Sequence, residues 1–269
     1  SPNRSSSANA PQPFVFTLSR QDLGEWQRKQ LDNTDVEVLT NSKVTEINEN
    51  YITVNRKDKY AYRTLVGADG VSSIVRRYLK IPTEKRLIGL QYLIPIKRDP
   101  KLEIFLDSKL FKAWYAWIFP HKNHIAVGCV CDPKIMEPSE LKKNFQIWLD
   151  QKGFDMTDSI YQSWPINYDY RGYKFGNVFL AGESAGLASG FTGEGIYQSL
   201  TSGDTVAHTI LDKNYSSKAM TSVLKYNKIQ NRIMTLLLKA GPLRGMLHEL
   251  VIIALNNKRI KNKINSGFS

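Results

Sequence analysis

The sequence is poor in the features that mark several common protein classes. It has only 2 cysteines in 269 residues, Cys129 and Cys131, which are too few for a disulfide scaffold and lack the partner residues of a zinc site. No run approaches the ~18 consecutive apolar residues of a membrane-spanning helix. Residues 1–10 lack the apolar stretch of a signal peptide. We therefore expect a cytoplasmic protein without a metal site.

Acidic residues are also scarce, since 25 Asp and Glu stand against 37 Lys and Arg, for a formal net charge of +12. Such a charge raises nucleic acids and anionic membranes as partners. The excess is concentrated in residues 221–269, which hold nine basic residues and one acidic residue, Glu249, beside apolar runs. We expect no nucleic-acid partner and a peripheral contact of this segment with an anionic membrane. The alternative is that its apolar stripe packs on the protein and its lysines face water.

Hydrophobic periodicity divides the chain into α/β and antiparallel β segments. Residues 1–13, rich in Ser, Asn and Pro, predict a flexible lead-in. Helices are expected after Ser19, with Trp26 on the apolar stripe, at 138–152, at about 194–211 and from 216 onward, the last divided at Gly241–Pro242. Strands are expected at 14–18, 36–39, 44–47, 51–54, 60–62, 65–68 and 178–181, and one antiparallel sheet at 87–96, 102–106, 113–119 and 124–131.

The first segment with chemical content is a strand end, an Asp–Gly turn and a short helix at residues 67–77. Asp69 supplies a carboxylate, Gly70 lets a ligand approach the backbone, and the start of the helix favours anions. This combination can hold a diphosphate or a ribityl group. The alternative is a strand–turn–helix that uses Asp–Gly only for its turn.

The second segment, at residues 178–195, is a buried strand followed by a glycine-rich turn. Glu183 stands just past the C-terminal end of the strand, where open α/β sheets bind their ligands. Gly193, Glu194 and Gly195 then open a helix whose first backbone amides would face such a ligand and stabilise negative charge. The alternative is a glycine-rich helix start without a ligand.

The third segment is an aromatic strand. Tyr115, Trp117 and Phe119 alternate along it, followed by Pro120 and, after seven more residues, by Gly128. A period of two places the three rings on one face, as a wall that suits a long apolar ligand. Ordinary packing of a sheet is the alternative.

Together these segments resemble FAD-dependent oxidoreductases of the flavoprotein hydroxylase type. The run Tyr115-Ala-Trp-Ile-Phe-Pro120 with Gly128, and the run Phe191-Thr-Gly-Glu-Gly-Ile-Tyr197, resemble the geranylgeranyl reductase family in particular. The resemblance implies FAD as cofactor and NAD(P)H or another reductant as electron donor. It also implies an isoprenoid or other lipid as the small-molecule substrate, whose carbon–carbon double bonds receive hydride from the reduced flavin.

The resemblance also implies two sets of site residues, but no catalytic proton donor. The cofactor-binding set comprises Arg20, Asp69, Gly70, Arg76, Gly182, Glu183, Gly193, Glu194 and Gly195. The substrate-binding set comprises Tyr115, Trp117, Phe119, Pro120 and Gly128. The sequence departs from the family at Glu183, where the family has aspartate, and at Val130, where it has its last glycine.

The fold that this resemblance implies is α/β, with an FAD-binding domain formed by residues 14–80 and 171–211. Residues 81–170 would form an antiparallel-sheet substrate domain, and residues 212–269 a C-terminal helical region. The family begins with a βαβ unit carrying GxGxxG, which this sequence lacks, so we expect a truncated or degenerate homologue. Two other functions stay open. One is a flavin-dependent monooxygenase or halogenase, although hydroxylases have His at the position of Gly186; the other is an inactive lipid-binding or interaction module.

Overall fold

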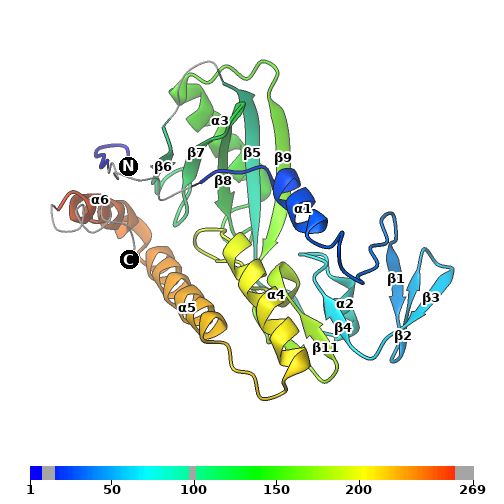
Figure 1. Ribbon diagram of the computed structural model, residues 1–269. Helices are drawn as coiled ribbons and strands as arrows, with labels where there is room; N and C mark the ends of the chain where they lie inside the picture. Colours follow the sequence, from blue (N-terminus) through cyan, green and yellow to red (C-terminus); the bar gives the residue numbers. More distant parts are fainter. Residues whose placement is uncertain (8–15, 97–100, 258–269) are drawn as a thin grey trace.

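The computed structural model describes residues 1–7, 16–96 and 101–257, and it combines α-helices with three separate β-sheets (Figure 1). The elements, in chain order, are α1 (Arg20–Lys29), β1 (Val44–Ile47), β2 (Tyr51–Val54), β3 (Asp58–Ala61), β4 (Leu65–Gly67), α2 (Ile74–Tyr78), β5 (Arg86–Pro95), β6 (Glu103–Phe105), β7 (Ala116–Pro120), β8 (His124–Cys131), α3 (Pro138–Lys152), β9 (Ile160–Asn167), β10 (Lys174–Phe175), β11 (Val178–Leu180), η1 (Gly182–Ala185), α4 (Ile196–Leu211), α5 (Lys218–Lys239), η2 (Gly241–Leu243) and α6 (Arg244–Leu255).

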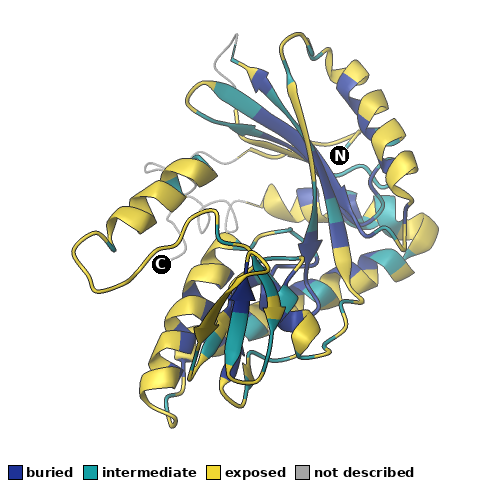
Figure 2. Cartoon of the chain, turned by 90° about the vertical axis from the view of Figure 1, so that its right-hand side faces the viewer, coloured by how far each residue is buried: buried dark blue, intermediate teal, exposed yellow. Residues whose placement is uncertain are grey.

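The largest sheet is antiparallel, as the sequence predicts, with the strand order β6-β7-β8-β5-β9. Helix α3 covers one of its faces, burying Leu141, Phe145, Trp148 and Leu149. Figure 2 shows buried residues along the strands of this sheet, with α3 on one side of it. The opposite face therefore turns toward residues 16–19 and α1, which lie on that side (Figure 1).

Both cysteines belong to the face that α3 covers. Cys129 and Cys131 are buried and unpaired, as expected for core residues. Burial raises the pKa of the Cys131 thiol to about 12. Because the thiolate is the reactive form, the two side chains act here as small apolar groups.

A three-stranded mixed sheet, of order β10-β11-β4, brings together the segments at 67–77 and 178–195, which we call the two glycine-rich segments. Strands β4 and β11 pair in parallel, with Gly67 opposite Leu180. Their C-terminal ends therefore lie side by side, and each end leads directly into one of the segments that the sequence singles out. Strand β4 is an edge of this sheet, and Val66 on it is 41% exposed.

Two strand predictions in the first part of the chain are wrong. Residues 16–18 and 36–39 form no strand, and Val36 and Val38 are exposed; residues 14 and 15 lie outside the described residues. No described strand runs beside these segments, and β propensity without a ladder partner does not make a strand. Helix α1 begins as predicted, because the Ser19 side chain caps it by accepting a hydrogen bond from the Asp22 amide, but Trp26 is 60% exposed.

Both ends of the described chain meet at α6. Arg4 forms an ion pair with Glu249 at 3.3 Å, and the Asn256 side chain donates to the Ser5 carbonyl. Residues 1–7, expected as a flexible lead-in, thus rest on the last helix; residues 8–13 lie outside the described residues. The division of the C-terminal helices at Gly241–Pro242 is confirmed. Among the described residues, no helix is long and apolar enough to cross a bilayer.

Candidate functional site

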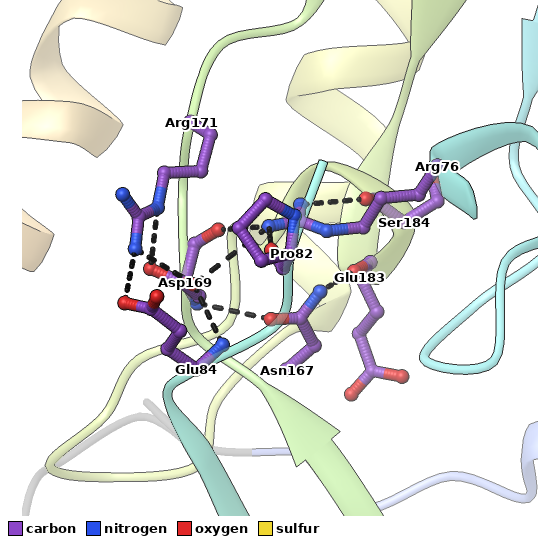
Figure 3. A network of polar contacts seen from close by, with 8 residues as sticks. All are labelled: Arg76, Pro82, Glu84, Asn167, Asp169, Arg171, Glu183 and Ser184. Carbon is purple, nitrogen blue, oxygen red and sulfur yellow. Dashed lines mark hydrogen bonds and ion pairs between the residues drawn. The ribbon is translucent and has the colours of Figure 1, made fainter. Parts of the chain in front are cut away.

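Arg76 links the two glycine-rich segments from inside the protein. Its guanidinium group, 2% exposed, donates to the backbone carbonyls of Ser184, Pro82 and Asp169 at 3.1, 2.7 and 2.8 Å (Figure 3). Burial lowers the pKa of Arg76, although the nearby carboxylate of Asp169 opposes the shift. Arg76 therefore fixes the turn after β11 against the helix after β4. Direct contact between Arg76 and a cofactor stays a prediction.

Asp169 completes this network from the segment after β9. Its carboxylate accepts hydrogen bonds from the Glu84 amide at 2.9 Å and from Arg171 Nε at 3.0 Å. Burial alone would raise its pKa, but these donors and the positive charges of Arg171 and Arg76 hold the pKa of Asp169 below its ordinary value. The sequence did not single out Asp169, because its partners come from distant parts of the chain.

Asp69 and Gly70 form the turn that the sequence predicts. Asp69 accepts hydrogen bonds from the amides of Ile74 and Val75, at 2.7 and 3.3 Å, and thereby orders the start of α2. Gly70 has a φ of +72°, with nothing within 4 Å of the place where a Cβ would stand, so glycine suits both the turn and a close approach of a ligand. The Asp69 side chain is exposed, which leaves its second carboxylate oxygen accessible.

Glu183 lies near enough to Arg20, which comes much earlier in the chain, for its pKa to respond to the arginine's charge. The turn η1 places the Glu183 carboxylate outside the Arg76 network, as Figure 3 shows, while the Glu183 carbonyl accepts from the Asn167 side chain. Burial raises the pKa of Glu183, and the positive charge of Arg20 opposes the shift. Gly182 makes the turn possible, with a φ of +61° and no room for a Cβ beside Ser199.

The run from Gly193 to Gly195 opens α4 as predicted. Gly193 has a φ of +73°, and Gly195 is the N-cap, with no side chain capping the helix. The amides of the first turn are therefore available to a ligand, and they carry the positive end of the helix dipole. Burial raises the pKa of Glu194. One residue in this turn escaped the sequence interpretation: Gln198 is 3% exposed, and within the described part of the chain its Oε1 atom has no hydrogen-bond partner.

The aromatic face has the geometry that the alternation predicts. The rings of Tyr115 and Trp117 are 6.0 Å apart, and those of Trp117 and Phe119 are 5.8 Å apart. Gly128 lies directly opposite Trp117 on the neighbouring strand, and a Cβ at Gly128 would collide with the indole and with the Leu90 carbonyl. Trp117 is 8% exposed and belongs to the main hydrophobic cluster. It is therefore at once a part of the aromatic face and a core residue.

The aromatic face extends to a second tryptophan that the sequence did not reveal. Trp164 of β9 stands opposite Gly89 of β5, where a Cβ would lie 3.1 Å from its indole. Strand alternation places Gly89 and Gly128 on the same face, so an indole from each side leans over a glycine. The signal in the sequence was the glycine within an otherwise apolar strand, which often marks such a close approach. Pro120 is the last residue of β7, and its carbonyl accepts a hydrogen bond from the Thr17 hydroxyl.

The aromatic face and the second glycine-rich segment meet directly. Tyr115 Oη donates to the Thr192 carbonyl at 2.6 Å, and Trp114 Nε1 donates to the Gly190 carbonyl at 2.9 Å. A Cβ at Gly193 would lie 3.4 Å from the Ile166 side chain, near the C-terminal end of β9. Segments expected to hold cofactor and substrate are thus joined by hydrogen bonds and van der Waals contact.

The described residues fit the ring-and-ribityl half of FAD. An uncapped helix N-terminus, an unpaired buried Gln198 oxygen and three glycines of positive φ gather around the ends of β4 and β11. Such a group of amides and glycines suits a ligand that is polar along one edge and negatively charged when reduced. The sequence offers no comparable glycine-rich loop for the diphosphate of the ADP half.

Solved structures place this fold in a known class. The chain resembles a probable FAD-dependent monooxygenase from Pseudomonas aeruginosa with a TM-score of 0.54 and 17% identity, covering 80% of this chain and 67% of the other. It resembles a geranylgeranyl bacteriochlorophyll reductase-like protein from Thermoplasma acidophilum with a TM-score of 0.53 and 20% identity, covering 76% and 55%. The fold is therefore that of the FAD-binding flavoprotein hydroxylases, as the sequence predicts.

Comparison of the sequence with known proteins finds relatives at 24–27% identity. Geranylgeranyl diphosphate reductase of Rhodobacter capsulatus is 24% identical over 237 residues, which cover 80% of this chain and 56% of the reductase. An uncharacterised protein of Methanosarcina barkeri is 27% identical over 231 residues, covering 81% and 57%. No protein-family model matches the chain. The chain is thus similar in sequence to geranylgeranyl diphosphate reductases, and it spans a little over half the length of these relatives.

Proposed function

We propose that this chain binds FAD and reduces carbon–carbon double bonds of an isoprenoid or similar lipid. The observation that carries the proposal is the junction at which Tyr115 of the aromatic face donates to Thr192 in the second glycine-rich segment. A flavin held by that segment and an apolar chain lying along the aromatic face would be neighbours. The names of the relatives supply the reaction type.

In this proposal the chain binds the cofactor and the lipid and orients them, and FAD, when bound, supplies the hydride. The first-turn amides of α4 stabilise negative charge at the flavin. Arg20 and Glu183 offer a cation and a carboxylate to the polar part of the cofactor.

The aromatic face positions the substrate and excludes water. Trp117 and Phe119 are stacked with an interplanar angle of 19°, which gives a smooth apolar wall along β7. An isoprenoid chain carries no hydrogen-bonding groups, so its alignment depends on the shape and the apolar area of such a wall. Tyr115 and Trp117 are held by the core, so the wall is preorganised.

We propose further that the C-terminal helices touch an anionic membrane. Exposed apolar side chains follow one stripe of α5, including Ile229, Ile233 and Leu236, and α6 exposes Leu250 and Val251. Exposed cations border the stripe on α5, namely Lys225, Lys228, Arg232 and Lys239. An apolar stripe edged with cations is the pattern of helices that bind membrane interfaces. The basic residues at 258–263 lie outside the described residues.

Vesicle co-sedimentation tests the membrane contact. We expect binding to anionic vesicles at low salt and little binding to neutral vesicles, with a loss of binding in Ile233→Asn/Leu236→Asn. The variant Ile104→Asn, which changes an exposed apolar residue of β6, serves as control. Equal binding to both kinds of vesicle, or to neither, contradicts the contact.

Anaerobic turnover tests the reaction. Purified chain with FAD, chemically reduced, is mixed with a geranylgeranyl lipid, and mass spectrometry follows the product. We expect a gain of two hydrogens for each double bond reduced, because one hydride and one proton add. Product that forms only with oxygen and gains an oxygen atom would instead indicate a monooxygenase, and FAD-loaded protein that leaves the lipid unchanged contradicts the proposal.

A further inference from the structure

A cavity of about 500 Å³ lies between α5 and the segments after β9 and η1. One wall comes from the segments after β9 and η1, including Tyr168, Tyr170 and Gly186, and the other comes from α5. The volume lies in the range of small-molecule sites. None of the residues described above for flavin or isoprenoid binding lines it; of the residues named for the membrane contact, only Lys228 and Arg232, at its rim, belong to its lining.

The charged side chains that line the cavity are all positive. Lys228 and Arg232, one helical turn apart on α5, line it, and none of its described lining residues is acidic. Within the described part of the chain, neither cation forms an ion pair. Two unpaired cations at the rim of one cavity favour an anion, and the fork of an arginine suits phosphate in particular.

The carboxamides of Asn227 and Asn231 add hydrogen-bond acceptors that a ligand of this cavity should satisfy. Asn227 is 8% exposed, and its Nδ2 donates to the Leu187 carbonyl at 2.8 Å, which fixes the orientation of the amide. Its Oδ1 atom, like Oδ1 of Asn231, is buried without a hydrogen-bond partner among the described residues. Unsatisfied buried acceptors are unfavourable. A ligand that donates hydrogen bonds to these oxygens would remove the deficit.

The remaining wall is apolar and closely fitted. A Cβ at Gly190 would lie 2.7 Å from Asn231 Oδ1 and within 2.5 Å of the Tyr168 ring, so this glycine allows the tyrosine and the carboxamide to approach the turn. The Tyr168 hydroxyl is occupied by Asp132 at 2.6 Å, which leaves the ring face and Leu224 as apolar surface.

We propose that this cavity binds the polar end of a phosphorylated polyol, with the phosphate at Lys228 and Arg232 and two free hydroxyl groups, one donating to Asn227 Oδ1 and the other to Asn231 Oδ1. A free glycerol phosphate and the headgroup of a phosphatidylglycerol-type lipid share this chemistry. The apolar wall would contact the first carbons of a lipid chain. The site is independent of the flavin site and its proposed reaction.

Isothermal titration calorimetry of the whole chain, without FAD, tests the site. We expect saturable binding of glycerol phosphate and at least tenfold weaker binding of inorganic phosphate and of glycerol. Lys228→Gln/Arg232→Gln should weaken glycerol phosphate binding at least tenfold. The matched control Lys225→Gln/Lys239→Gln removes the same charge from α5 outside the cavity and should leave the affinity unchanged.

A second variant separates the hydroxyl contact from the charge. Asn231→Leu should abolish the preference for glycerol phosphate over inorganic phosphate while phosphate still binds. Dihexanoyl phosphatidylglycerol, below its micelle concentration, identifies the source: tenfold tighter binding than glycerol phosphate supports a lipid headgroup, and equal or weaker binding supports a free phosphorylated polyol. Absence of saturable binding, equal affinity for glycerol phosphate and phosphate, or equal loss in the control pair overturns the proposal.

Discussion

The hydroxyl of Tyr115 donates a hydrogen bond to the carbonyl of Thr192 at 2.6 Å, across 77 positions of sequence. This bond joins the aromatic face, at the residue just before β7, to the glycine-rich turn that leads into α4. Tyr115 is 9% exposed, and burial raises its pKa far above the ordinary value. Burial therefore favours the neutral hydroxyl that donates this bond.

Tyr115→Phe tests the importance of this bond. We expect a loss of about 1 kcal/mol in the free energy of unfolding, because the Thr192 carbonyl loses a buried donor, and weaker FAD binding because the turn before α4 is freed. Urea unfolding and flavin titration measure the two effects. Tyr60→Phe, which removes the hydroxyl of an exposed tyrosine, should change neither; a Tyr115→Phe chain that binds flavin normally contradicts the coupling.

We expect Arg76→Gln to lower the free energy of unfolding strongly, because it breaks the buried network between the two glycine-rich segments. The substitution leaves three buried carbonyls and the Asp169 carboxylate with too few donors, and breaking a buried charged network of this kind costs about 3–5 kcal/mol. Thermal and urea unfolding give the measurement. Arg77→Gln alters the neighbouring exposed arginine, and a similar loss there would show that the network around Arg76 carries no special weight.

The Asp169 network predicts an acid limit to stability. Because the folded pKa of Asp169 lies below its ordinary value, its contribution is fully present above the unfolded pKa of about 3.9 and is lost as the pH falls through the folded value. Urea unfolding between pH 7 and pH 2 should show Asp169→Asn less stable than the wild type at pH 7, with the difference closing below about pH 4. A constant difference over that range would contradict the linkage, and Asp58→Asn in an exposed hairpin is the control.

The contact between Trp117 and Gly128 predicts a coupled pair. Gly128→Ala forces the new methyl group against the indole and the Leu90 carbonyl, at a cost of about 1–3 kcal/mol for overpacking. Trp117→Leu creates space on the same spot, so the double variant should lose less stability than the two single losses combined. Strict additivity in urea unfolding would show that the indole does not depend on the glycine.

The sequence predicted those parts of the fold that depend on local patterns. Helix α3 and strand β8 have the predicted bounds, because amphipathic spacing and alternation are complete within each segment. The strand predicted at 36–39 does not form, since a strand also needs a neighbouring strand within hydrogen-bonding distance. Strand β9 was missed because Pro165 interrupts its pattern, although it lies at the edge of the sheet, where proline is tolerated.

The site was predictable where a residue acts through its backbone. Positive φ values at Gly70, Gly182 and Gly193 follow from the turns that the sequence indicates. The hydrogen-bond partners of long side chains were not predictable: Arg76 donates to three carbonyls, two of them from distant parts of the chain, and only the folded chain shows which acceptors surround it.

Titration of the chain with FAD, followed by flavin absorbance and fluorescence, tests the central claim most directly. We expect saturable binding with a dissociation constant roughly in the micromolar range, because the residues proposed to hold the ring and ribityl chain are in place while the sequence lacks a glycine-rich loop for the diphosphate. Each charge-assisted hydrogen bond that is missing costs about 1.5–3 kcal/mol. Gly193→Ala, which strains the turn before α4 at a φ of +73°, should weaken binding, whereas Gly176→Ala, at a φ of +65° in a distant exposed turn, should not. The absence of saturable flavin binding, or an affinity insensitive to Gly193→Ala, would contradict the account.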